Sequence, residues 1–274
     1  MKRQSVLMLA TVMLTSLVPT GTVSADLTDG LVAYYPFNGN ANDATGNGHD
    51  GTVSGATLTA DRFGNPNSAY SFDGIDDHIG VTYADAFQLP SLTLSVWVRP
   101  SVDLLTSSTN YMAILTRGED STWDYAAFGL FAKAGSNGVS AHYEDNSDVS
   151  YFYNTNYYPQ PNIWTHLVAT KNSNEELNIY SNGQLLQTWD PTPQITTNCF
   201  QDLTIGAYLP NPPSPPYDLV NFFHGSLDDV MIYDRVLSAD EIGELTIIPA
   251  PAAVVLCSIG LGLAGCKLRR RKEP

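Results

Sequence analysis

The chain has 274 residues, 28 of them acidic and 13 basic, and its formal net charge is −15 at neutral pH. Seven of the basic residues and one of the acidic residues lie in two distinctive terminal segments. The body between these segments is long enough for one domain with its own core. It holds six basic and 27 acidic residues, a net charge of −21. A surface this acidic repels nucleic acid and anionic membranes, which excludes both as partners, and it suits a secreted protein that binds divalent cations or neutral ligands.

The first 25 residues have the three parts of a secretory signal peptide. Lys2 and Arg3 give a positive start, an apolar stretch covers residues 6–18, and the small residues VSA, ending at Ala25, form a cleavage site. The apolar stretch is shorter than the roughly 20 residues of a comfortable membrane span, and a cleavage site follows it. We therefore predict export with cleavage after Ala25. An uncleaved anchoring helix is the alternative.

Short β-type segments with turn residues between them recur through the body, and helical periodicity is nearly absent. In LTLSVWVR (92–99), every second residue from Leu92 to Val98 is Leu or Val, which gives one apolar face. The candidate strands are 31–37, 69–73, 78–83, 92–99, 111–117, 126–132, 138–144, 163–171, 176–181, 184–189, 202–208 and 223–233. Strands of this number and spacing predict an all-β, antiparallel two-sheet sandwich. Because both ends of the domain are strand-like, we expect its first and last strands to be neighbours.

Two local signals fix details of this sandwich. Asn182-Gly183 lies between two strand-like runs and predicts a tight hairpin with positive φ angles. The sequence SADE, beginning at Ser238, is a capping box, which predicts one short helix over residues 239–245 at the end of the domain. The proline-rich stretch 210–216 is interpreted as a long loop within the sandwich.

The C-terminal tail, residues 247–274, contains a proline element, an apolar segment at 252–266 and a basic cluster at 267–272. An apolar helix followed by basic residues halts in the membrane with the basic cluster in the cytoplasm. This order resembles the PEP-CTERM sorting tail of Gram-negative-type bacteria, which a membrane protease-transpeptidase called exosortase recognises. Pro249 and Pro251 flank an alanine where the usual motif has glutamate. The resemblance implies transient insertion in the inner membrane, processing, and a location at the cell surface or outside the cell. A permanent single-span anchor is the alternative.

Six motifs follow one another along the body: GLVAYYPFNGNANDATGNGHDGTV (30–53), AYSFDGIDDHIGV (69–81), SLTLSVWVRP (91–100), WTHLVATK (164–171), NGQ (182–184) and GSLDDVMIYDRVLSADEI (225–242). In these motifs and their order, the body resembles the concanavalin A-like, laminin-G-like jelly-roll domains of bacterial secreted proteins. The resemblance covers nearly all of 28–245 and defines a domain at 26–246. It implies two stacked antiparallel sheets of six or seven strands, and a role in carbohydrate or protein binding rather than catalysis.

The catalytic pattern of this fold is absent. Laminarinase-type glycoside hydrolases place Glu-x-Asp-x-x-Glu on one strand, where alternate residues share a face and bring the carboxylates together at the sugar cleft. None of the glutamates of the body lies in that pattern, and the histidines are scattered without a nucleophile elbow or zinc-ligand spacing. We therefore predict that the protein is not an enzyme.

A structural calcium ion is a further expectation. Calcium binds six to eight oxygens, often from carboxylates and carbonyls in irregular loops, and the resemblance to laminarinase-type proteins maps Asp228 onto the side-chain ligand. The backbone carbonyls would come from near Phe37 and Gly74. Asp229 should then point to the opposite face of the strand. Two turns also offer oxygens, although such residues commonly only cap turns: Asn38, Asn42, Asp43 and Asp50 in the first, and Asp73, Asp76 and Asp77 in the second.

Aromatic residues cluster among Asn, Asp and Ser in the middle of the chain. Rigid aromatic rings provide flat surfaces for sugars or proteins, while neighbouring polar groups adapt to the ligand. We predict ligand contacts by Trp123, Tyr151, Tyr153 and Tyr157, although some of these rings should face the core. The sequence therefore predicts a secreted, non-catalytic module that binds a glycan or matrix component. The alternatives are a structural surface protein without a specific ligand, and a glycoside hydrolase.

Overall fold

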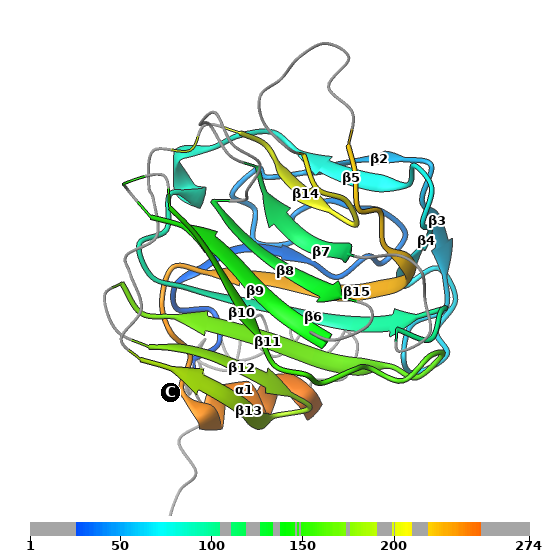
Figure 1. The fold of residues 1–274 in the computed structure, drawn as a ribbon. Helices are drawn as coiled ribbons and strands as arrows, with labels where there is room; N and C mark the ends of the chain where they lie inside the picture. Colours follow the sequence, from blue (N-terminus) through cyan, green and yellow to red (C-terminus); the bar gives the residue numbers. More distant parts are fainter. Residues whose placement is uncertain are drawn as a thin grey trace, which may run out of the picture.

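The computed structural model (Figure 1) describes residues 26–104, 111–118, 127–133, 138–145, 147, 149–173, 176–190, 199, 201–209 and 219–247. Within them the chain forms two antiparallel sheets and one α-helix. The sheets pack face to face, with the smaller sheet in front in Figure 1. This architecture confirms the predicted jelly-roll sandwich.

The larger sheet has eight strands, and β1 (Leu31–Tyr35) pairs with β15 beside the main path. This pairing confirms that the first and last strands are neighbours. The main path is β13 (Gln184–Trp189), β12 (Leu177–Ser181), β11 (Thr165–Lys171), β6 (Leu92–Pro100), β15 (His224–Tyr233), β4 (Ala69–Asp73) and β3 (Thr57–Thr59).

The smaller sheet has seven strands. Their order is β10 (Ser150–Asn154), β9 (Gly138–Glu144), β8 (Phe128–Lys133), β7 (Tyr111–Arg117), β14 (Leu203–Ile205), β5 (His78–Val81) and β2 (Gly51–Ser54). Strands β2, β3 and β10 were not predicted. All three are edge strands of three to five residues, and their sequences lack an alternating apolar pattern.

The main core fills the space between the sheets. In β6, the apolar residues at positions 92, 94, 96 and 98 all belong to it, as the alternation of the sequence predicts. Side chains at the intervening positions of both sheets point outward. The sandwich therefore has two outer faces, one on each sheet.

The outer face of the larger sheet is partly covered by α1 (Ala239–Ile247), where Ile242 and Leu245 pack against Val168 of β11. The predicted capping box is confirmed, because the Ser238 amide donates to Glu241 at 2.7 Å and the Glu241 amide donates to the Ser238 hydroxyl at 3.3 Å. The helix ends two residues later than expected.

The predicted hairpin is also confirmed, since Asn182 and Gly183 join β12 to β13 with φ angles of 48° and 76°. The predicted signal peptide with its cleavage site at Ala25, the tail with Pro249 and Pro251, and the apolar segment 252–266 lie outside the described residues. In the parts of the chain that the structure describes, no helix has the length and apolar character needed to cross a membrane.

Candidate functional site

Strand β10 carries two of the tyrosines predicted to contact a ligand. Tyr151 and Tyr153 point between the sheets, where both stack on Tyr143 of β9 with ring centroids 5.7 and 5.4 Å away. Tyr153 also meets Trp189 of the opposite sheet edge to face at 5.3 Å. Both tyrosines therefore belong to the edge of the core rather than to an outward-facing stacking surface.

Tyr157 lies in the segment that follows β10. Its carbonyl accepts a hydrogen bond from the Val139 amide at 2.7 Å, and its half-buried ring packs against the main core. The structure thus brings Tyr151, Tyr153 and Tyr157 together at one end of the sandwich, but on its inner side. Trp123, the fourth predicted contact, lies outside the described residues.

The outer face of the smaller sheet carries a different set of rings. Phe152 of β10 meets His142 of β9 edge to face at 4.3 Å, and His142 stacks on Phe131 of β8 at 4.4 Å. Phe131 in turn meets Tyr111 of β7 at 6.2 Å and Tyr208 at 5.9 Å. These five residues form a continuous line across four strands and one adjoining loop, which we call the outer aromatic row.

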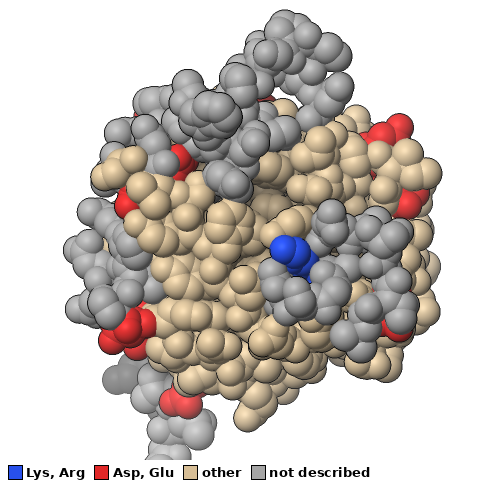
Figure 2. All heavy atoms as spheres, viewed as in Figure 1, with Lys and Arg blue, Asp and Glu red and all other residues tan. Residues whose placement is uncertain are grey.

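The row is accessible at Phe152, which is 39% exposed, and at the half-buried Tyr111, while its other rings are buried. The Lys133 ammonium lies 4.2 Å from the centre of the Tyr111 ring and donates to its hydroxyl at 2.6 Å. Burial, together with the charge of Lys133, lowers the pKa of His142 to about 3, so this ring is neutral at neutral pH. In Figure 2, residues other than Lys, Arg, Asp and Glu cover most of the described part of the visible face, a basic side chain lies near its middle, and acidic residues lie toward its margins.

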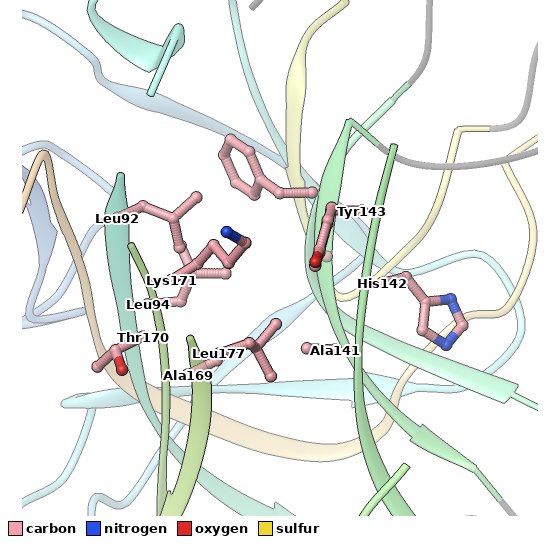
Figure 3. A pocket seen from close by; sticks show the side chains of 11 residues that line it. Leu92, Leu94, Ala141, His142, Tyr143, Ala169, Thr170, Lys171 and Leu177 are labelled. Atoms are coloured by element: carbon pink, nitrogen blue, oxygen red, sulfur yellow. The ribbon is translucent and has the colours of Figure 1, made fainter. Parts of the chain in front are cut away.

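Among the described residues, one small cavity lies between the two sheets. A cavity near Lys171 and Tyr143 has a volume of about 10 Å³, about the space that one water molecule needs. Figure 3 shows Tyr143 pointing into this space and His142 pointing away from it, on the other side of the same strand. This cavity is therefore too small for a sugar.

Asp228 and Asp229 lie on the other sheet, in the middle of β15. A β-bulge interrupts the pairing of β15 with β6 between Asp228 and Met231, and Asp229 has a φ angle of 45°. The expectation that the two carboxylates point to opposite faces was wrong, because the extra residue of the bulge turns both toward the Arg62 guanidinium. The Arg62 Nη1 atom lies 3.0 Å from Asp228 and 2.6 Å from Asp229.

A sequence profile for the concanavalin A-like lectin/glucanases superfamily (Laminin_G_3) matches residues 72–243, more than half of the chain. The chain belongs to this superfamily. No curated protein sequence matches the chain.

Solved structures share this concanavalin A-like fold at low sequence identity. Domain 4 of AbnA, a GH43 extracellular arabinanase from Geobacillus stearothermophilus in complex with arabinotriose, is 20% identical with a TM-score of 0.62, covering 79% of this chain and 98% of that one. The binding domain of Paraclostridial Mosquitocidal Protein 1 is 17% identical with a TM-score of 0.60, covering 79% and 52%. The binding domain of botulinum neurotoxin DC, in complex with SialylT, is 16% identical with a TM-score of 0.57, covering 80% and 51%. The chain thus spans about half the length of these toxin domains.

The calcium position implied by the concanavalin A-like resemblance does not assemble in this chain. Asp228 faces the Arg62 guanidinium, which holds the place where a cation would bind. Gly74 lies beside His224, four residues before Asp228 on β15, a separation of about 13 Å along a strand. The Phe37 carbonyl accepts a hydrogen bond from the Gly39 amide at 2.8 Å. With Arg62 in place, these residues do not fit a calcium ion.

In the acidic turns of this concanavalin A-like domain, carboxylates accept hydrogen bonds from nearby backbone amides. Asp43 accepts hydrogen bonds from the Tyr34, Thr45 and His49 amides. Asp73, Asp76 and Asp77 have carboxylate oxygens within 4.8 Å of one another. Within that group the Asp73 carboxylate accepts from the Ile75 amide, and the buried Asp77 accepts from the Asp73 amide. These contacts are those of turn-capping residues.

Among the described strands, the Glu-x-Asp-x-x-Glu pattern of laminarinase-type glucanases does not occur. Glu144 of β9 is the one glutamate on a described strand, and it is buried. Ser95 and His166 approach each other at 2.8 Å between the hydroxyl and Nε2, but both side chains are buried in the larger sheet. A substrate cannot reach that pair without opening the fold.

Proposed function

We propose that this protein is a non-catalytic recognition module that binds a carbohydrate or an extracellular matrix component through the outer aromatic row. The observation that carries this proposal is the line of rings on the smaller sheet, accessible at Phe152 and Tyr111. Sugars present flat C–H faces, and aromatic rings offer flat apolar surfaces on which such faces pack. Because His142 is neutral and the Tyr111 hydroxyl is held by Lys133, the row combines apolar faces with few fixed polar groups, as binding sites commonly do.

The related structures support this proposal in a general way. They include a domain of an arabinanase in complex with arabinotriose and a toxin binding domain in complex with SialylT. Fold alone does not fix a ligand, so the proposal rests on the rings of this chain.

We further propose export of the protein, processing of its tail by an exosortase-type enzyme after transient insertion in the inner membrane, and a location at the cell surface or outside the cell. The signal-like and sorting-like segments of the sequence support these steps.

A glycan array with purified residues 26–246 tests the binding proposal, with arabino-oligosaccharides and sialylated oligosaccharides among the probes. We expect binding of at least one glycan by the wild type and loss of that binding in Phe152→Ala. Leu185→Ala is the matched control, because Leu185 is a 52% exposed apolar residue on β13 of the other sheet. Binding by the control but not by Phe152→Ala supports the outer aromatic row as the site.

A structural role without a specific ligand is the competing function. Absence of binding to every glycan and matrix polymer tested would favour it, and would contradict the recognition proposal. A glycoside hydrolase would release reducing sugar from β-glucan or arabinan during prolonged incubation. We expect no release above that of heat-denatured protein.

A further inference from the structure

Arg62, Asp228 and Asp229 form a buried cluster on the outer side of the larger sheet. Their side chains are 6%, 3% and 5% exposed. One atom, Nη1 of Arg62, donates hydrogen bonds to both carboxylates, at 3.0 Å to Asp228 and 2.6 Å to Asp229. Two carboxylate oxygens from one strand therefore converge on a single positive point, which is the arrangement that a bound metal ion requires of its ligands.

The remaining carboxylate oxygens are held by hydrogen-bond donors. The Tyr34 hydroxyl donates to Asp229 Oδ1 at 2.6 Å, and the Asp229 amide donates to Asp228 Oδ1 at 2.8 Å. Each carboxylate is thus fixed with its other oxygen turned toward Arg62. The converging geometry is built into β15 by its bulge and by Tyr34, and it does not depend on the arginine alone.

The Arg62 guanidinium is held by aromatic rings and by the turn that carries it. Its central carbon lies 4.5 Å from the ring centres of both Phe63 and Trp97, so cation–π attraction adds to the ion pairs. The turn is fixed by the Asp61 carboxylate, which accepts the Phe63 and Asn65 amides, each at 2.8 Å. Arg62 is therefore placed at the carboxylates by preformed structure.

We propose that Arg62 takes the place of a bound cation, and that its removal creates a divalent-cation site formed by Asp228 and Asp229. Two buried carboxylates that face each other repel unless a cation or a shared proton lies between them, and removal of the charged partner of such a cluster is strongly destabilising. A calcium ion binds carboxylate oxygens at about 2.3–2.6 Å. The Asp229 oxygen already lies 2.6 Å from Nη1, and the Asp228 oxygen, at 3.0 Å, would have to move closer to the ion. The vacated space would admit the ion with water as its further ligands. This inference does not depend on the proposed glycan binding.

Thermal melting of wild type and Arg62→Ala, each in EDTA and in about 10 mM CaCl₂, tests the proposal. We expect the melting temperature of Arg62→Ala in EDTA to fall by roughly 10 °C, and calcium to raise it by several degrees more than it raises that of the wild type. Asp228→Asn in the Arg62→Ala background should abolish this extra calcium response. Arg99→Ala is the matched control, because Arg99 is half-buried on the same sheet but contacts Trp164 and Ser226 instead of a carboxylate.

An Arg62→Ala protein whose calcium response equals that of the wild type would overturn the proposal. If Arg62→Ala is unfolded in EDTA, recovery of near-ultraviolet circular dichroism in CaCl₂ supports the site, and absence of recovery counts against it. Arg62→Lys restores a positive charge, so we expect it to fold without the extra calcium response. A Tb³⁺ ion in the vacated position would lie beside Trp97, and sensitised emission in Arg62→Ala above the wild-type level would locate the ion there.

Discussion

The alternation of side chains on β10 gives a direct test of the outer aromatic row. Phe152 points outward to His142, whereas its neighbour Tyr153 points inward to Tyr143 and Trp189. Substitution of each by alanine removes one aromatic ring from adjacent positions of the same edge strand. The two variants should therefore differ in ligand binding although they are neighbours in the sequence.

The magnitudes follow from the contacts of each ring. Tyr153→Ala removes two aromatic pairs worth about 0.5–1.5 kcal/mol each and part of a buried side chain, so we expect a loss of about 2–3 kcal/mol in unfolding free energy. Phe152 is already 39% exposed, and full burial of such a ring is worth about 1.5–3 kcal/mol, so Phe152→Ala should cost about 1–2 kcal/mol. Phe152→Ala should also weaken glycan binding by roughly tenfold or more, the effect of about 1.4 kcal/mol.

Urea denaturation measures the stability of both variants, and isothermal titration with the glycan that gives the strongest array signal measures their affinity. We expect Tyr153→Ala to bind like the wild type under conditions where it is folded. The reasoning would be refuted by the reverse result, in which folded Tyr153→Ala loses binding and Phe152→Ala retains it. That outcome would place the ligand at the inner, tyrosine-lined edge of the sandwich.

Three further predictions concern stability. The folded His142 ring stays neutral down to about pH 3, whereas the unfolded chain takes up this proton near pH 6.5, so stability is lost as the pH falls through this window. The urea midpoint should therefore fall less between pH 7 and 4.5 in His142→Gln than in the wild type, and equal losses would contradict the argument. Ser238→Ala removes the helix cap and should cost about 1 kcal/mol in a urea titration, while Ser238→Thr should cost less. Gly183→Ala places a side chain at a φ angle of 76° and should cost about 1–2 kcal/mol; a midpoint equal to that of the wild type would show that the hairpin relaxes.

Much of the fold could be predicted because several strands alternate between apolar and polar residues, and because an Asn-Gly turn marks the start of the edge strand β13. The ranges 69–73, 111–117, 138–144 and 184–189 agree with the structure residue for residue. The short edge strands could not be found in this way, since residues such as those of β2 are mostly exposed and carry no apolar pattern. Strand β10 reads SYFYN, in which three consecutive aromatic residues hide the alternation.

The candidate site was harder to predict because its strand lacks a clear apolar alternation and because residues far apart in the sequence meet in the structure. Periodicity alone did not show that Phe152, rather than Tyr151 or Tyr153, faces outward, because all three are aromatic. The ion-pair partner of Asp228 and Asp229 could not be predicted from local sequence, since Arg62 is 166 residues before the first of them. The bulge at Asp229 left no signal other than the tolerance of Asp for positive φ angles.

The position of α1 makes the two outer faces of the domain different. The helix packs on the outer side of the larger sheet, and Leu27 and Leu31 from the start of the described chain pack against the same apolar cluster. The outer aromatic row lies on the opposite outer face, across the full thickness of the sandwich. The chain therefore leaves the domain after Ile247 on the side of the larger sheet, opposite the outer aromatic row. If the tail tethers the protein to a surface, the rings are presented away from that surface, toward ligands that approach from outside.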